Sequence, residues 1–286
     1  SCLWACFFSR KKFVTTFHGT YNFSSRLKLF YNSVMVRSKL IIAGSNFIFN
    51  HINENYKKYL HPKKKLMVIF RGINLEYFNS ENIPETKINS LAQKWNINKN
   101  DFVVLLPGRL TRWKGQEMFI ESLYLLTAKY NKNNFHAIIL GSDQGRGVYS
   151  KKLFLLVERY RLRKKITFVK NCKEMPVAYK LADIAVSSSI EPEAFGRVAV
   201  EAQAMKKPIV ASNLGGSKET VLKERSGLLF RPADTEELAS IINKLMEMEK
   251  ESLSLMGEHG RKNVEKKFNV DQMCQTTFTE YKKLLK

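Results

Sequence analysis

Two charged clusters in the sequence carry residue types that could bind a phosphorylated sugar. The segment EPEAFGRVAVEAQAM places Glu193 and Glu201 eight positions apart, around a Phe-Gly turn that is expected to open a helix. Upstream, PGRLTRWKGQ offers Arg109, Arg112 and Lys114 on a loop that follows an apolar run. Cationic side chains can meet phosphates, and carboxylates accept hydrogen bonds from hydroxyls. This combination predicts a site for a sugar bound to a diphosphate, with Arg112 better explained as a cation in solvent.

The segments around these clusters alternate between strand and helix patterns from residue 101 onward. Short apolar runs predict strands at residues 102–108, 135–141, 166–169, 183–189, 208–212 and 227–230. Helical spacing of apolar residues predicts helices at residues 115–130, 149–162, 175–182, 196–205, 235–249, 253–267 and 270–285. This alternation indicates an α/β fold with a doubly wound parallel sheet covered on both faces. Ligands of such sheets bind at the carboxyl ends of the strands, and both charged clusters directly follow strands.

Residues 1–97 are predicted to form a separate, smaller unit of the same kind. Strand patterns there occupy residues 13–19, 39–45 and 65–72, and a helix is expected over 21–38. Residues 80–90 are polar and contain a proline, so they are expected to link this unit to a second domain at 98–267. A final segment, 268–286, is expected to form a helix that packs back toward the first domain. Three strands are few for a doubly wound domain, so we expect the first domain to be incomplete.

The basic composition limits the classes of partner. The chain has 286 residues, a formal net charge of +22 and an isoelectric point near 9.8. Its Lys and Arg residues are spread in short runs, such as 63–65, 163–165 and 282–283, without a recognisable nucleic-acid-binding module. We interpret them mainly as solvated surface, with attraction to an anionic membrane surface as the alternative. Nucleic acid is not an expected partner.

The cysteines and the apolar segments indicate the compartment. Cys2, Cys6, Cys172 and Cys274 lack the paired spacing of a zinc site, and nothing in their arrangement requires an oxidising environment. No apolar run reaches the ~20 residues that a membrane-spanning helix needs. The apolar start of the chain is too short for a signal peptide, and its cationic residues follow it rather than precede it. We expect a cytoplasmic protein, with peripheral attachment to the inner face of the membrane as the alternative.

A series of motifs in the chain resembles glycosyltransferase family 4. These are GRLTRWKG, GSDQGRG, the E-x7-E pattern that encloses FG, KPIVAS, the GG pair with Glu219 three residues later, and GLLF followed by PAD. FHGTYN, IAGSNFI and RGINLEYF resemble later segments of the family's N-terminal domain, in the same order. The resemblance implies the GT-B fold, with two Rossmann-like domains. It also implies a retaining enzyme that uses a nucleotide sugar. The family's early N-terminal strands and glycine-rich loop have no counterpart here.

The resemblance also suggests roles for the charged residues. Arg109 and Lys114 match the residues that bind the donor diphosphate, where fixed cations would stabilise the negative charge that grows on the leaving phosphate. Glu201 matches the family's ligand for the nucleotide ribose, with a surface ion pair as the alternative. Glu193 matches the carboxylate that contacts the donor sugar, with capping of the helix dipole as the alternative. His18 matches the histidine that faces the sugar across the interdomain cleft, with a structural role as the alternative.

Glycines and helix amides add further candidates. Phe195, Gly196 and the residues after them would present the N-terminal amides of a helix, which form an anion site to which a glycine allows close approach. Gly19 beside His18 favours a site at that strand end. Gly215 and Gly216 are expected to form a tight turn. Glu219 is either an acid in the first turn of a helix or a nucleotide contact.

The sequence lacks the motifs of several common enzyme classes, which reduces the number of reactions to consider. No D-x-D pattern is present to hold a divalent ion, so we expect neither a metal nor another cofactor. The phosphate loop of kinases, the G-x-G-x-x-G dinucleotide motif and the G-x-S-x-G nucleophile elbow are missing as well.

The expected partners are a UDP- or GDP-sugar donor and a glycan or glycolipid acceptor. The resemblance and the basic surface together suggest bacterial envelope glycan synthesis, such as that of lipopolysaccharide. One alternative is a truncated, non-catalytic remnant that still binds nucleotide. A further alternative is a basic protein that binds nucleic acid or a membrane surface.

Overall fold

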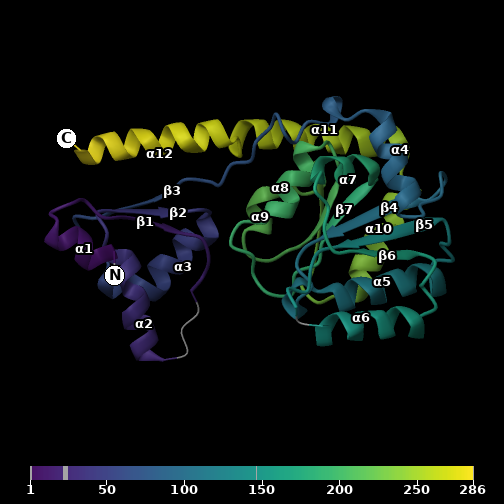
Figure 1. Cartoon of the computed structure of the whole chain (residues 1–286), viewed down its shortest axis with the longest axis horizontal. Helices are drawn as coiled ribbons and strands as arrows, with labels where there is room; N and C mark the ends of the chain where they lie inside the picture. Colours follow the sequence, from purple (N-terminus) through teal and green to yellow (C-terminus); the bar gives the residue numbers. More distant parts are fainter. Residues whose placement is uncertain (1, 22–24, 146, 286) are drawn as a thin grey trace.

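The molecule consists of two lobes, each built on a parallel β-sheet (Figure 1). The computed structural model describes residues 2–21, 25–145 and 147–285. Within these residues, the sheet of the first lobe has the order β1-β2-β3 and that of the second lobe has the order β6-β5-β4-β7-β8-β9. Every strand pair in both sheets is parallel. The predicted α/β fold with two parallel-sheet units is confirmed.

The strands of the second lobe follow the predicted apolar runs. They are β4 (Phe102–Pro107), β5 (Phe135–Leu140), β6 (Ile166–Val169), β7 (Ile184–Ser187), β8 (Ile209–Ser212) and β9 (Gly227–Phe230). The chain moves outward from β4 to β6 and then returns to the other side of β4 to build β7, β8 and β9. The strand order therefore reverses between β4 and β7, which in doubly wound sheets is where ligands bind.

Helices cover both faces of this sheet and bury two separate cores. One face carries α5 (Gln116–Ala128), α6 (Gly147–Arg159) and α10 (Thr235–Glu247). The other carries α4 (Glu85–Lys94), α7 (Met175–Leu181), α8 (Arg197–Ala204) and α11 (Lys250–Lys267), with the short α9 (Ser217–Thr220) beside α8. Alternate residues of β4 enter the two cores: Val104 packs on the first and Leu105 on the second. This explains why the strand is apolar throughout rather than alternating.

The first lobe is smaller and more exposed. It contains β1 (Val14–Phe17), β2 (Leu40–Ala43) and β3 (Lys65–Val68), with α1 (Cys2–Phe8), α2 (Arg26–Asn32) and α3 (Asn46–Tyr56). Short 3-10 turns follow α2 and α3 at Ser33–Arg37 and Lys57–Tyr59. The single helix predicted over 21–38 is therefore a shorter α-helix plus a 3-10 turn, and residues 22–24 lie outside the described residues. Helix α1 was not predicted, and its Trp4, Phe7 and Phe8 side chains are largely exposed.

The segment predicted to link the lobes is more ordered than expected. Residues 80–90 contain a 3-10 turn (Ser80–Asn82) and the first part of α4, which packs on α7 in the second lobe. Pro84, the proline of this predicted linker, is the N-cap residue of α4. Proline fits at a helix start because the first backbone N–H groups have no partner within the helix.

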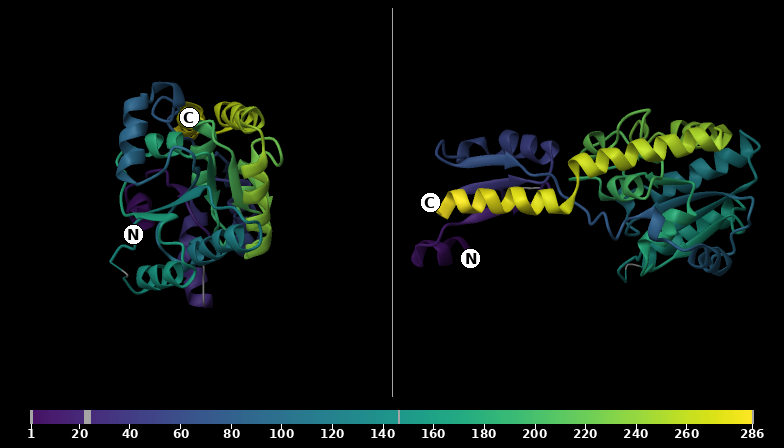
Figure 2. Two further views of the ribbon diagram at one scale, coloured as in Figure 1. Left: turned by 90° about the vertical axis from the view of Figure 1, so that its right-hand side faces the viewer. Right: turned by 90° about the horizontal axis from the view of Figure 1, so that it is seen from above.

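A C-terminal crossing connects the lobes. Helix α12 (Val270–Leu285) runs from α11 along the sheet of the first lobe (Figures 1 and 2). Met273 and Leu284 pack on Leu40 and Ile42 of β2. At the crossing, a β-carbon on Gly72 would lie 2.4 Å from Cα of Val270, so only glycine allows this approach. Among the described residues, no helix is both long and apolar enough to cross a bilayer.

Candidate functional site

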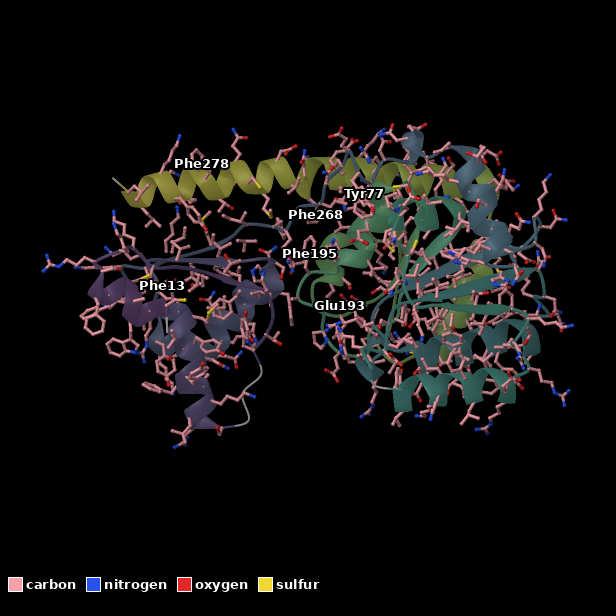
Figure 3. The ribbon with its side chains drawn as sticks, viewed as in Figure 1. Phe13, Tyr77, Glu193, Phe195, Phe268 and Phe278 are labelled. Atoms are coloured by element: carbon pink, nitrogen blue, oxygen red, sulfur yellow. The ribbon has the colours of Figure 1, made fainter. Side chains whose placement is uncertain are left out.

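A cleft of about 780 Å³ lies between the lobes, at the carboxyl edge of the second-lobe sheet. The first lobe contributes His18, Gly19, Thr20 and Arg71, from the ends of β1 and β3. The second lobe contributes the loops after β4, β5, β6 and β7. Figure 3 shows Glu193 and Phe195 on the side of the second lobe that faces the first. The reversal of strand order between β4 and β7 thus brings the two predicted charged clusters to one cleft.

Gly115 allows the loops after β4 and β7 to touch. It has a φ of +71° at the start of α5, and a β-carbon there would lie 1.9 Å from the carbonyl oxygen of Ser188. The Ser188 hydroxyl donates to the carbonyl of Lys114 at 2.9 Å. A larger residue at position 115 would force the two loops apart and separate the cations from the carboxylates.

Glu193 lies at the centre of this loop contact. Lys114 Nζ donates to Glu193 Oε1 at 2.8 Å, and the hydroxyls of Ser187 and Ser189 donate to the same oxygen at 3.2 and 2.5 Å. Burial by itself raises the pKa of Glu193, but the Lys114 charge and the three donors outweigh it, so the pKa is lowered. The carboxylate is therefore charged at neutral pH. Glu193 Oε2 has no hydrogen-bond partner among the described residues, which leaves it available to a ligand.

Glu201 is held by two partners on the same side of the cleft. Arg197 Nε donates to its Oε1 at 2.6 Å, and the buried Tyr179 hydroxyl donates to its Oε2 at 3.0 Å. Burial and the Glu201 charge raise the pKa of Tyr179 well above its ordinary value, so this hydroxyl keeps its proton. The predicted ribose ligand thus lines the cleft in an ion pair. Each carboxylate oxygen can accept a second hydrogen bond, so the pair does not exclude a ribose contact.

Three cations of the cleft form no ion pair in the described part of the chain. They are Arg71, Arg109 and Lys170, and all three are exposed. Arg109 and Lys114 both lie over the ring of Trp113, at 6.0 and 4.4 Å from its centroid. Trp113 thus packs within the loop. The cleft therefore contains three unpaired cations next to two carboxylates whose negative charges are already balanced by Lys114 and Arg197.

His18 faces this cluster from the first lobe. Partial burial lowers its pKa, and the nearby positive charge of Arg71 lowers it further. The imidazole is therefore neutral at neutral pH. Its neighbour Gly19 also lines the cleft.

The start of α8 forms the wall of the cleft beside Glu193. Gly196 has a φ of +85° and is the N-cap residue of α8, while Phe195 is buried against Phe268 with ring centroids 5.6 Å apart. Both predicted residues line the cleft. Gly215 and Gly216 do not line it. A β-carbon on either would lie within 3 Å of the backbone of the Glu193–Phe195 loop, which they support from behind.

Glu219 does not line the cleft. It lies in the first turn of α9, as one of the two interpretations had it, but its carboxylate accepts hydrogen bonds from the start of α3 in the other lobe. No sequence pattern indicated this contact. Arg71 and Lys170 were not predicted either, although a search for charged residues directly after strands would have found them. The hydroxyls of Ser187 and Ser189 stand within the run SSS at the end of β7 and could have been found the same way.

No cluster of three or more His, Cys, Asp and Glu side chains suited to a metal occurs among the described residues. The expected independence of metals and cofactors stays a prediction. Chemically, the cleft can neutralise an anionic group with Arg71, Arg109 and Lys170. Next to that group it can accept a hydroxyl at Glu193 Oε2.

Comparisons with known proteins agree with this geometry. The family model described as Glycosyl transferases group 1 matches residues 87–263. The capsular polysaccharide biosynthesis glycosyltransferase CapM of Staphylococcus aureus is 27% identical over 217 residues, which are 75% of this chain and 53% of that protein. The chain spans about half the length of the curated relatives it matches.

Solved structures share the fold over nearly the entire chain. A glycosyltransferase from Rickettsia africae has a TM-score of 0.90 and 33% identity, covering 100% of this chain and 74% of that one. HepE from Anabaena, crystallised with UDP and glucose, has a TM-score of 0.86 and 26% identity, covering 98% of this chain and 74% of that one. These structural neighbours confirm the predicted GT-B fold.

Proposed function

The chain belongs to the glycosyl transferases group 1 family, and we propose that it moves a sugar from a nucleoside-diphosphate sugar to a hydroxyl of an acceptor, with retention. The chain spans about half the length of its curated relatives. The activity that those relatives' names imply is therefore proposed for this chain. The observation that carries it is the interlobe cleft, where free cations adjoin a charged carboxylate with one unoccupied oxygen. This arrangement matches a ligand that carries phosphates at one end and hydroxyls at the other.

The chemistry follows from the charges. When the bond between sugar and phosphate breaks, negative charge grows on the leaving diphosphate and positive charge on the sugar ring. Arg109 follows β4 and forms no ion pair with the described residues. It would stabilise the negative charge on the leaving diphosphate more in the transition state than in the ground state. Glu193, held in its ionised form by Lys114, would orient the sugar through a hydroxyl and favour the positive charge on the sugar ring. His18 is neutral and can accept a hydrogen bond on the opposite side. No metal or other cofactor is required in this scheme.

The donor and the acceptor are narrower proposals. UDP is the first nucleotide to test because the neighbouring HepE was crystallised with it, and GDP is the second. The acceptor is proposed to be an envelope glycan or glycolipid, of which lipopolysaccharide is one example. Its support is CapM, whose name assigns it to capsular polysaccharide biosynthesis. A cytoplasmic location with attachment to an anionic membrane surface is proposed on the net charge of +22.

Thermal unfolding with UDP, GDP and ADP tests the donor site. A nucleotide at 100 times its dissociation constant stabilises the folded chain by about 2.7 kcal/mol. We expect UDP to raise the melting temperature of the wild type and of Arg112→Ala, but much less that of Arg109→Ala. Arg112 is the matched control because it is an exposed cation of the same loop that does not line the cleft. If no nucleotide shifts the transition, the chain does not form a donor site and the proposed function fails for it.

A further inference from the structure

Glu219 joins the second lobe to the first lobe's helix α3. Its Oε2 accepts from the backbone N–H of Asn46 at 2.8 Å and from Asn46 Nδ2 at 2.9 Å, and its Oε1 accepts from the backbone N–H of Phe47 at 2.5 Å. These are the first two amides of α3, which have no acceptor within the helix. A carboxylate at this end also meets the positive end of the helix dipole. One side chain therefore satisfies two orphan donors across the lobe boundary.

Ser45 makes a second contact at the same place. Its hydroxyl donates to the carbonyl of Ala194 at 2.5 Å and accepts from the backbone N–H of Ile48 at 3.1 Å. Ser45 is thus the N-cap residue of α3 and also hydrogen-bonds to the backbone of the loop that follows Glu193. Ala194 in turn packs on the apolar core of the first lobe.

The Glu193 loop is consequently held from two sides. Within its own lobe, the backbone N–H of Gly216 donates to the carbonyl of Glu193 at 2.7 Å, and Gly216 directly precedes α9, which carries Glu219. From the other lobe, the hydroxyl of Ser45 hydrogen-bonds to the carbonyl of Ala194. The residue before Ser45, Gly44, borders the Arg71 side chain, since a β-carbon on Gly44 would lie 3.2 Å from Arg71 Cγ. Residues 44–47 therefore contact both walls of the cleft.

We propose that Glu219 is a positioning residue that docks α3 onto the Glu193 loop and so sets His18 and Arg71 opposite Glu193. This role rests on the proposed function of the cleft. Glu219 does not touch the donor in this scheme. Its loss should leave nucleotide binding to the second lobe intact and lower the rate of transfer, which needs both walls.

Amide hydrogen exchange in the full chain tests the contact directly. Glu219→Gln keeps the size of the side chain but replaces one acceptor oxygen with a donor and removes the charge. Loss of a hydrogen bond to a charged group predicts about 10- to 100-fold faster exchange at Asn46 and Phe47. The amide of Phe49, which donates to the Ser45 carbonyl, is the internal reference and should not change. Glu224→Gln is the control variant, because Glu224 is an acid in the segment after α9 whose side chain is 72% exposed.

The same variants separate positioning from binding. For Glu219→Gln we expect the UDP dissociation constant within about twofold of the wild type and kcat for sugar transfer lowered by about tenfold or more. Asn46→Ala, which removes only the side-chain bond, should lie between this variant and the wild type.

Unchanged exchange at Asn46 and Phe47 in Glu219→Gln would overturn the proposal. So would a loss of UDP affinity as large as the loss of kcat, because Glu219 would then act on the nucleotide. If the wild type bound none of UDP, GDP and ADP, the proposed function would fail and the positioning role with it, whereas the exchange data would still report whether the interlobe contact exists.

Discussion

The two walls of the cleft are built in different ways. On the second lobe, Glu193 and Lys114 have side chains that are only 10% and 13% exposed, and Glu201 is held by Arg197 and Tyr179. On the first lobe, His18 and Arg71 are exposed, and Arg71 forms no ion pair with any residue the structure describes. The buried carboxylates of the second wall thus have their partners within their own lobe. The first wall gains its place from contacts between the lobes, at α3, at α12 and at the Gly72 crossing.

The contrast between the two walls predicts how variants of each wall change stability and function. A buried, partnered charge ties the site to the stability of the lobe, because removal of one partner leaves the other without compensation. An exposed, unpaired charge can be removed with little effect on folding. Variants of the buried, partnered side chains of the second wall should therefore change stability and function together, whereas variants of the exposed Arg71 in the first wall should change function alone.

The largest effect is expected from Lys114→Met. This change keeps the aliphatic stem and removes the charge, so Glu193 remains buried without its cation. Breaking a buried pair in this way costs about 3–5 kcal/mol of unfolding free energy. Chemical denaturation at pH 7 measures it, with Arg109→Met as the matched control on the same loop. A loss below about 1 kcal/mol would show that the wall is not preorganised by this pair.

Arg71→Ala should produce the opposite result. Unfolding free energy should stay within about 0.5 kcal/mol of the wild type, because the side chain is exposed and unpaired. Sugar transfer should fall about 10- to 100-fold, since a charge-assisted hydrogen bond to the anionic group is lost during the reaction. Denaturation and a transfer assay on the same sample separate the two effects. A large loss of stability would mean that Arg71 supports the fold instead.

Acid should affect the two walls in different pH windows. The pKa of Glu193 is lowered from 4.5, so its contribution is complete above pH 4.5 and is lost as the pH falls through the lower folded pKa. The pKa of His18 is lowered from 6.5, so below pH 6.5 the unfolded chain takes up the proton first and stability falls. Denaturation series for Glu193→Gln and His18→Gln should each lack one of these losses. If both variants kept the wild-type profile, the two groups would not be perturbed by the fold.

The smallest effect is expected at the exposed face of α1. Phe7 is 69% exposed, so Phe7→Gln should change the unfolding free energy by no more than about 0.5 kcal/mol. In the second lobe, Phe119 is fully buried, and Phe119→Ala should cost about 3–5 kcal/mol. Equal losses for the two variants would show that the lobes do not differ in packing as their exposure implies.

Much of the second lobe could be predicted from local patterns. Apolar runs such as residues 102–108 marked strands correctly, because a strand covered on both faces is apolar along its length. The positions of Arg109 and Glu193 directly after strands placed both at one sheet edge. The first lobe was harder to predict, since α1 is short and mostly exposed and leaves no periodic signal of burial. The polar composition of residues 80–90 hid the start of α4, which gains its stability by packing on α7.

The fold class and the residue types at the carboxyl edge of the sheet follow from the amino-acid sequence, because strand periodicity and turn chemistry are encoded within about a dozen neighbouring residues. The pairing of Lys114 with Glu193, the free oxygen of that carboxylate and the contact of Glu219 with α3 could be found only in the folded molecule. The partners in these contacts are 79 and at least 172 residues apart. Pairing over such separations depends on strand order and on the approach of two lobes, which no local pattern contains.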